Sequence, residues 1–192
     1  AGQPAREVFR VVGEALGTYI IVERSDGIVL IDKHAAHERI IFDRLKARQG
    51  GLMSQTLIAP AIFSPGAEDL ELIFEHGELL AELGFEIEPY GENTAVIRAV
   101  PADTEEDPVP LLEEILEKLR SGRAGDLSGA RDQILHTIAC KAAIKAGKRS
   151  EPAELEALAE RVLSGEVKYC PHGRPVAVTL TKKELDREFK RI

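Results

Sequence analysis

The densest group of chemically capable side chains lies in the segment Asp32-Lys33-His34-Ala35-Ala36-His37-Glu38, which holds two carboxylates and two imidazoles. Residues of these types, so close in sequence, are typical of a metal site. His34 and Glu38 are four residues apart, so they would share one face of a helix. The structural alternative is a hydrogen-bonded core pair, with Asp32 as the N-cap of the helix.

A second segment, Cys170-Pro171-His172-Gly173-Arg174-Pro175, lies near the C-terminus. In an extended chain Cys170 and His172 project to the same side, because they are two residues apart. The prolines restrict the backbone, and Gly173 permits a tight turn. This pattern indicates a chelating loop. The alternative is a Pro/Gly loop around a buried thiol that binds nothing.

Cys140 is the second of only two cysteines, and it falls in an Ala-rich stretch that predicts a helix from Gln133 to Gly147. A disulfide with Cys170 is the structural alternative. The sequence shows no sign of secretion, so we interpret both thiols as ligands. Thiolates mixed with nitrogen and oxygen donors favour zinc over magnesium. His136 is expected to be a core or surface residue.

The first motif is positioned by a predicted strand and helix. Apolar runs at Tyr19–Glu23 and Ile28–Ile31 flank a Gly-containing turn, which predicts a β-hairpin. Ala35–Arg48 has no Gly or Pro and predicts a helix. Asp32 would therefore lie where a strand ends and a helix begins, and the helix face toward the core would carry the candidate ligands.

The rest of the chain predicts an α/β fold of the α+β kind with two lobes. The candidate metal ligands come from both ends of the chain, whereas the middle is predicted to form helices and a hairpin without such residues. We expect one lobe from residues 1–45 plus 139–192 and an inserted lobe from residues 46–138. The predicted elements are an acidic helix at Pro65–Leu83, a hairpin through Gly84–Val100, a polar turn at Pro101–Pro110, helices at Leu111–Arg120 and Pro152–Leu163, a strand at Val176–Leu180 and a final helix that starts with a capping box at Thr181–Glu184.

Taken together, these motifs resemble the C-terminal domain of the bacterial mismatch-repair MutL family, of the kind that carries a latent endonuclease. The family pattern Asp-Gln-His-Ala-x2-Glu-x4-Glu corresponds here to Asp32-Lys33-His34-Ala35, Glu38 and Asp43. The family's Ala-Cys-Arg corresponds to Ala139-Cys140-Lys141, and its Cys-Pro-His-Gly-Arg-Pro is unchanged at 170–175. The family's Phe-x-Arg corresponds to Phe189-Lys190-Arg191. Lys33 and Lys141 leave the candidate ligand atoms intact. Asp43 is one methylene shorter than the Glu of the family.

The resemblance implies a homodimerising, metal-dependent endonuclease that nicks duplex DNA, with Zn2+ and/or Mn2+ as the cofactor. The implied metal ligands are Asp32, His34, Glu38, Cys140, Cys170 and His172; the implied catalytic residues are Asp32, His34, Glu38 and Arg174; and the weaker candidates are Asp43, Lys141 and Arg191. The alternative role of Arg174 is to form a salt bridge that holds the loop. Two rival functions are a dimerisation and partner-docking module with a closed structural zinc, and a cysteine hydrolase with Cys170 as nucleophile.

A third motif, Gln55-Thr56-Leu57-Ile58-Ala59-Pro60, is similar to the Gln-x-x-Leu/Ile-x-Pro peptide with which family members dock into the replicative sliding clamp. Gln55 would supply hydrogen bonds, while Ile58 and Pro60 would fill an apolar pocket. The resemblance therefore implies a regulatory role for the inserted lobe. The alternative is that Thr56–Phe63 forms a buried core strand.

Composition limits what the chain can do by itself. Its 192 residues are 44% hydrophobic, with a formal net charge of -8 and a pI near 5.3. This charge argues against strong autonomous binding to duplex DNA, which depends on cations that displace counterions from phosphates. Late basic residues, among them Lys182, Lys183 and Arg187, form either a solvated face or a local DNA path.

Further expectations concern context. We find no apolar run long enough to span a membrane. Residues 1–6 are interpreted as linker, and the chain as part of a larger protein. The resemblance implies that ATP acts only through an N-terminal ATPase domain, that a mismatch-recognition protein is met through the full-length protein, and that the setting is the bacterial cytoplasm.

Overall fold

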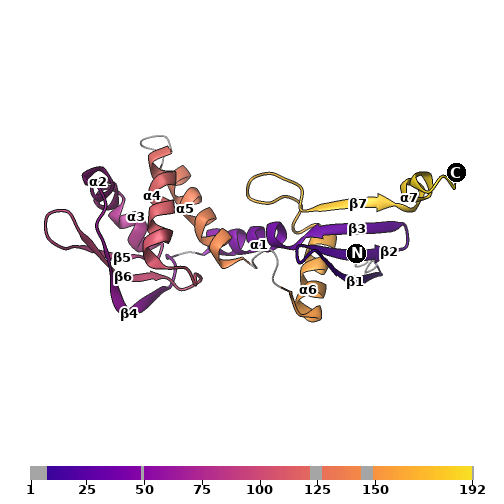
Figure 1. Cartoon of the computed structure of the whole chain (residues 1–192), viewed down its shortest axis with the longest axis horizontal. Helices are drawn as coiled ribbons and strands as arrows, with labels where there is room; N and C mark the ends of the chain where they lie inside the picture. The colour runs from indigo at the N-terminus through magenta and orange to yellow at the C-terminus, as the bar shows by residue number, and fades with distance from the viewer. Residues whose placement is uncertain (1–7, 49, 122–126, 144–148, 192) are drawn as a thin grey trace. The chain divides into compact units, whose positions relative to one another are not determined.

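The computed structural model describes residues 8–48, 50–121, 127–143 and 149–191, and these residues form a mixed α/β fold (Figure 1). Helices and two antiparallel sheets occur together, so the predicted α+β class is confirmed. The chain divides into two compact units, residues 1–40 with 143–192 and residues 41–142. The described residues contain no helix whose length and apolar character would let it cross a bilayer.

The first unit is built on a four-stranded antiparallel sheet in the order β1-β2-β3-β7 (Figure 1). The strands are β1 (Phe9–Ala15), β2 (Tyr19–Arg24), β3 (Gly27–Asp32) and β7 (Ala177–Thr181). Tyr19 pairs with Asp32 and Arg24 with Gly27, which confirms the predicted hairpin. Strand β7 comes from the far end of the sequence and pairs with β3.

Helix α6 (Pro152–Leu163) covers one face of this sheet. It begins where predicted, because proline is tolerated in the first turn and Glu151 and Glu154 form a capping box. Its apolar face shares a buried cluster with alternate residues of β2 and β3; the members are Leu155, Leu158, Ala159 and Val162 with Ile20, Val22, Val29 and Ile31. Each fully buried aliphatic side chain contributes roughly 1.5–3 kcal/mol, so this contact holds the unit together.

The opposite face of the same sheet is apolar and exposed to solvent. Val12, Tyr19 and Val178 are 54%, 41% and 56% exposed. Ile21 and Leu30 lie between them on the paired strands and are half-buried. Alternation along the strands therefore gives the sheet two apolar faces, of which α6 covers one.

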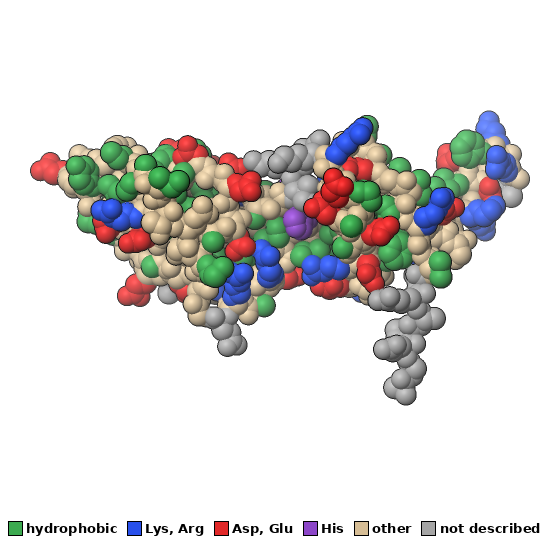
Figure 2. Space-filling view, turned by 90° about the horizontal axis from the view of Figure 1, so that it is seen from below, with side chains coloured by type: hydrophobic (Ala, Val, Ile, Leu, Met, Phe, Trp, Pro, Cys, Tyr) green, Lys and Arg blue, Asp and Glu red, His purple; other side chains and the backbone are tan. Residues whose placement is uncertain are grey.

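Helix α7 (Lys182–Glu188) follows β7 and is stabilised by the predicted capping box. Thr181 Oγ1 accepts the Glu184 N–H at 3.2 Å, and a Glu184 carboxylate oxygen accepts the Thr181 N–H at 2.8 Å. None of its side chains is buried. Figure 2 shows Lys and Arg side chains gathered at the end of the first unit that carries α7.

The second unit has a three-stranded sheet in the order β4-β6-β5, with β4 (Ser54–Phe63), β5 (Glu86–Pro89) and β6 (Ala95–Pro101). Its helices are α2 (Ala67–Glu75), α3 (Gly77–Glu82), α4 (Pro108–Ser121) and α5 (Leu127–Ala142). Helix α4 packs against α2, α5 and β4 through a fully buried row that includes Leu112 and Ile115. Helix α1 (Lys33–Ala47) begins in the first unit, and its residues from 41 onward belong to the second.

Four predicted helices differ from the structure in their bounds. Helix α1 runs from Lys33 to Ala47 rather than from Ala35 to Arg48, a difference of one or two residues at each end. The single helix at Pro65–Leu83 is wrong, because His76 adopts φ -98 and ψ 16 and separates α2 from α3 just before the flexible Gly77.

Helix α4 begins at Pro108 rather than Leu111, so the predicted turn at Pro101–Pro110 is too long. Proline fits the first helical position, and Asp107 Oδ1 accepts the Val109 N–H at 3.1 Å.

Helix α5 begins at Leu127 rather than Gln133. Gly129 lowers the intrinsic helix propensity by only about 1 kcal/mol, which packing against α4 offsets. The predicted C-terminal end of this helix, at Lys145 and Gly147, lies outside the described residues.

The alternative that Thr56–Phe63 is a buried core strand is also wrong. The segment is a strand, but most of β4 is exposed and Ile58 is 108% exposed. Pairing with β6 is irregular between Thr56 and Ala61. The middle of β4 therefore leaves the regular ladder and presents its side chains to solvent.

Candidate metal centre

The candidate metal centre begins at the junction of β3 and α1. Asp32 is the last residue of β3, and its Oδ1 accepts the N–H of Ala35 at 3.0 Å. Asp32 is thus a helix N-cap, as the structural alternative expects. The carboxylate has a second oxygen and further lone pairs, so capping and cation binding are compatible.

Pairing between β3 and β7 brings the second motif to this junction. Ile31 pairs with Ala177, and the Asp32 N–H donates to the carbonyl of Val176 at 2.8 Å. Residues 170–175 directly precede Val176, so the Cys-Pro-His-Gly-Arg-Pro segment lies beside the end of β3. Motifs more than 130 residues apart in sequence are joined by one strand pair.

The second motif forms a tight loop. Tyr169 bridges to Pro175, and the Cys170 N–H donates to the Arg174 carbonyl at 2.8 Å. The Gly173 N–H donates to the Cys170 carbonyl at 2.9 Å, and Gly173 takes φ 83, which only glycine adopts without strain. The predicted tight turn is confirmed, and its geometry leaves His172 exposed.

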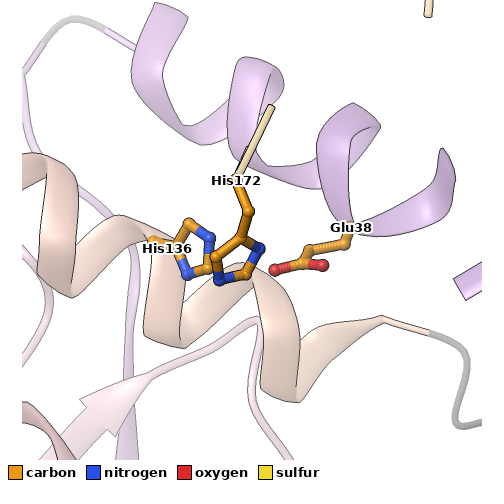
Figure 3. Close-up of side chains that lie close together, drawn as sticks. All are labelled: Glu38, His136 and His172. Atoms are coloured by element: carbon orange, nitrogen blue, oxygen red, sulfur yellow. The ribbon is translucent and has the colours of Figure 1, made fainter. Parts of the chain in front are cut away.

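Glu38 and His172 are two ligand-type residues of the first unit whose ligand atoms lie near each other. Glu38 projects from α1 one turn after His34 and is only 4% exposed. A carboxylate oxygen of Glu38 and a ring nitrogen of His172 lie within 4.8 Å, and the two side chains point toward each other in Figure 3. Two ligands about 2.0–2.2 Å from one zinc ion lie at most about 4.4 Å apart, so a small rotation of either side chain would suffice.

The electrostatics of Glu38 fit a cation. Burial raises the pKa of the Glu38 carboxyl, and the charge of Asp32 acts in the same direction. Positive charge on His172 and His34 lowers that pKa, in opposition to burial. A buried carboxylate with this desolvation cost is stabilised by a bound divalent cation, which favours the ionised form. The donor set of two carboxylates and two imidazoles therefore fits such an ion.

Cys170 is packed differently from the other candidates. Its side chain is 4% exposed and belongs to the apolar cluster with Ile31, Ala36 and Val176. Cys140 and Cys170 are both free thiols. A buried thiol is poorly placed to attack a substrate, which weighs against the cysteine-hydrolase alternative. Zinc ligation by Cys170 stays a prediction.

Some predicted residues belong to the second unit. Asp43 is exposed on α1, and Cys140 is half-buried on α5. Lys141 pairs with Glu114 at 2.9 Å, and this contact raises the pKa of the Lys141 ammonium group.

His136, also drawn in Figure 3, belongs to the second unit as well. It is half-buried on α5, and its ring meets that of Phe42 edge-on, with 6.2 Å between centroids. The expectation that His136 is a core or surface residue stays a prediction.

Arg174 and Arg191 have different surroundings. Arg174 is exposed on the loop, two residues after His172. Arg191 lies beyond α7, with its guanidinium 5.7 Å from the Phe189 ring centroid. Because Thr181 pairs with Gly27 at the other end of β3 from Asp32, β7 leads away from the junction before α7 begins.

Sequence reasoning missed the environment of Lys33, which it treated as a harmless variation. The Lys33 side chain is 0% exposed, and its ammonium lies 2.5 Å from Glu14 Oε1. The other oxygen of Glu14 accepts the N–H of Ser150 at 3.2 Å. Only the strand pairing that turns Glu14 to the same side as Ile20 could have revealed this contact.

Comparison with known proteins gives consistent matches. Residues 12–150 match the family described as MutL C terminal dimerisation domain. Proteins named DNA mismatch repair protein MutL are similar to this chain: the one from Caldanaerobacter subterraneus subsp. tengcongensis is 37% identical over 185 residues, and the one from Methanothrix thermoacetophila 39% over 187. These alignments cover 95% and 96% of the chain but only 31% and 33% of the two relatives.

Proposed function

Because the chain belongs to the family of MutL C terminal dimerisation domains, we propose that it acts in DNA mismatch repair as the self-associating part of a longer protein and nicks duplex DNA with a bound divalent metal. One observation carries the proposal: the pairing of β3 with β7 sets the Asp32 motif beside the 170–175 loop, with buried Glu38 next to His172.

In this proposal Asp32, His34, Glu38 and His172 hold the ion, and Cys170 and Cys140 are further predicted ligands. A bound divalent ion would supply a Lewis acid that polarises the scissile phosphate and lowers the pKa of a bound water toward about 7. Zinc suits the imidazole and thiolate donors, whereas manganese suits the carboxylates. Glu38 is buried on α1, so its carboxylate would hold the ion away from bulk water.

Arg174 is proposed to orient the DNA backbone. Its guanidinium is exposed on the loop that carries His172, so a phosphate at the ion would lie within reach of a planar cation. Guanidinium groups bind phosphate through two parallel hydrogen bonds, which fixes orientation as well as charge. Asp43, Lys141 and Arg191 remain weaker candidates.

Self-association is proposed to use the open face of the first unit's sheet. Val12, Tyr19 and Val178 expose apolar surface there, flanked by half-buried Ile21 and Leu30. The cores of homodimer interfaces are more apolar than other protein surface, so a second copy is the partner that this face fits.

The exposure of Gln55, Ile58 and Pro60 on β4 supports a contact with the sliding clamp through these side chains. The fully exposed Ile58 offers the kind of apolar anchor that fills a pocket on a partner.

We propose that the protein acts in the bacterial cytoplasm. ATP and the mismatch-recognition protein would act through other parts of the longer protein, and duplex DNA would be brought to this acidic chain by those parts.

The second candidate function is a docking module without catalysis, held by a structural zinc. The N-cap role of Asp32 favours it, because this residue already has a structural task without catalysis.

A nicking assay separates the two functions. Supercoiled plasmid is incubated with the full-length protein and manganese, and with the same protein after chelation. We expect open-circle product only with the metal. Absence of nicking with manganese, by protein that contains a stoichiometric amount of zinc before chelation, would favour the docking module.

A further inference from the structure

The Lys33–Glu14 pair is an unusual feature of the first unit. The Lys33 side chain is fully buried, and that of Glu14 is 11% exposed. Removing two charges from water is costly, and replacing such a pair by apolar residues is often neutral or stabilising. A contribution to stability is therefore a weak explanation for the pair, and the position of the pair points to a role in holding neighbouring segments.

The pair connects three segments that are far apart in sequence. Lys33 is the first residue of α1, Glu14 belongs to β1, and Ser150 directly precedes the residue that caps α6. Glu14 receives Lys33 Nζ on one oxygen at 2.5 Å and the Ser150 N–H on the other at 3.2 Å. The Lys33 N–H donates to the carbonyl of Thr18 at 3.1 Å, so both the backbone and the side chain of Lys33 are fixed.

Lys33 also stands between two candidate ligands. Asp32 precedes it and His34 follows it, so any displacement of Lys33 turns both neighbours. We propose that the buried Lys33–Glu14 ion pair fixes the strand-to-helix junction, and that Lys33 is a positioning residue for the metal site. The inference rests on the proposed metal-binding function, and it concerns a residue that would not touch the ion.

One backbone amide reports the geometry of the junction without metal. Ala35 lies in the first turn of α1, where N–H groups have no acceptor within the helix. Its N–H is instead bonded to Asp32 Oδ1 at 3.0 Å. Protection of the Ala35 amide from hydrogen exchange therefore measures how well Asp32 is held, and the Leu158 amide within α6 is an internal reference.

The main variant is Lys33→Met with Glu14→Gln, which removes both charges and keeps an acceptor for Ser150. Lys33→Met by itself leaves a buried unpaired carboxylate, so it shows the loss of stability that the double variant should avoid. The matched control is Arg10→Met with Glu23→Gln, which removes an exposed ion pair between the neighbouring strands β1 and β2.

For the double variant we expect a melting temperature within a few degrees of the unmodified protein. We also expect a roughly tenfold loss of Ala35 protection in metal-free protein and a zinc affinity that is lower by about 10–100-fold, as for the loss of groups that orient ligands. The Arg10→Met, Glu23→Gln control should change neither the Ala35 protection nor the zinc affinity.

A folded double variant with unchanged Ala35 protection overturns the proposal, and so does unchanged zinc affinity. If the double variant does not fold, Glu14→Gln by itself is measured in the same way, because it weakens the tether and keeps the Lys33 donor. Failure of the unmodified protein to bind zinc would overturn the metal-binding function instead, and Ala35 protection would then still decide whether the pair holds the junction.

Discussion

At the scale of single residues, Glu38 links the stability of the domain to its proposed chemistry. Its carboxyl is buried on α1, and burial raises its pKa. A group whose pKa is higher in the folded state favours folding when protonated. That contribution is complete below the unfolded pKa and is lost as the pH rises through the folded pKa.

We therefore expect Glu38→Gln to stabilise the metal-free protein near pH 7, because glutamine carries no charge that must be buried. As the pH rises above about 4.5, the unmodified metal-free protein should lose unfolding free energy relative to the variant, because the carboxyl groups that the two proteins share contribute equally to both. Urea unfolding across this pH range measures both.

The same variant should bind zinc at least about tenfold more weakly, since it lacks an anionic ligand. A variant that is less stable at neutral pH, or one that binds zinc as the unmodified protein does, would contradict this account of Glu38. His37→Gln is a suitable control on the same helix, because His37 occupies a variable position of the motif.

At the scale of elements, the pairing of β3 with β7 is what assembles the site. Gly27 allows the close approach of the two strands: a Cβ at this position would lie 2.3 Å from the Leu180 carbonyl oxygen. Because Gly27 pairs with Thr181, any side chain here pushes β7 away from β3.

Gly27→Ala should therefore destabilise the protein by about 2 kcal/mol or more, as backbone clashes commonly do. It should also weaken zinc binding, since β7 anchors the loop that carries His172. Gly77→Ala is the control, because a Cβ there meets nothing within 4 Å. Equal thermal stabilities of the two variants would show that the close approach is not required.

The exposed part of β4 leads to a prediction about the clamp. Gln55→Ala with Ile58→Ala removes the proposed hydrogen-bonding group and apolar anchor from an exposed segment, so folding and zinc content should be unchanged. Binding to the sliding clamp, measured by surface plasmon resonance, should weaken by at least about tenfold, the loss expected for an anchoring residue. Unchanged clamp affinity would remove this segment from the list of contacts.

The sequence predicts much of this framework, since its elements carry local signals. The Gly-containing turn before Ile28, the start of α6 at Pro152 and the capping box at Thr181 depend on neighbouring residues, and all three were predicted correctly. The break at His76 could not be predicted, because the apolar pattern continues across it. The apolar pattern of 56–63 does not say what covers it, so only the resemblance to a clamp-docking peptide implied that β4 is exposed.

In the candidate site, too, local sequence patterns predict some features and tertiary structure sets the others. Asp32, His34 and Glu38 share a junction and a helix face that local periodicity predicts. The contact of Glu38 with His172 depends on the register between β3 and β7, which no local pattern encodes. The buried partner of Lys33 is set by tertiary structure in the same way.

At the scale of the whole molecule, the open sheet face leads to a prediction about self-association. Val178→Arg places a charge beside Leu30 on the open face of the sheet without entering the core beneath α6. The dimer dissociation constant should rise by at least about tenfold, because burying an unpaired charge is costly. Sedimentation equilibrium measures it, with Phe74→Arg on α2 as the control; an unchanged constant would place the dimer interface elsewhere.

The central claim is that Asp32 binds a catalytic ion, and Asp32→Asn in the full-length protein tests it most directly. Asparagine is as good an N-cap as aspartate, so the bond to Ala35 persists while the charge that a divalent ion requires is lost. Asp26→Asn is the matched control in the same unit. We predict that Asp32→Asn remains a folded dimer and loses manganese-dependent nicking of supercoiled DNA, with or without the sliding clamp. Nicking by this variant at the unmodified rate would contradict the catalytic assignment.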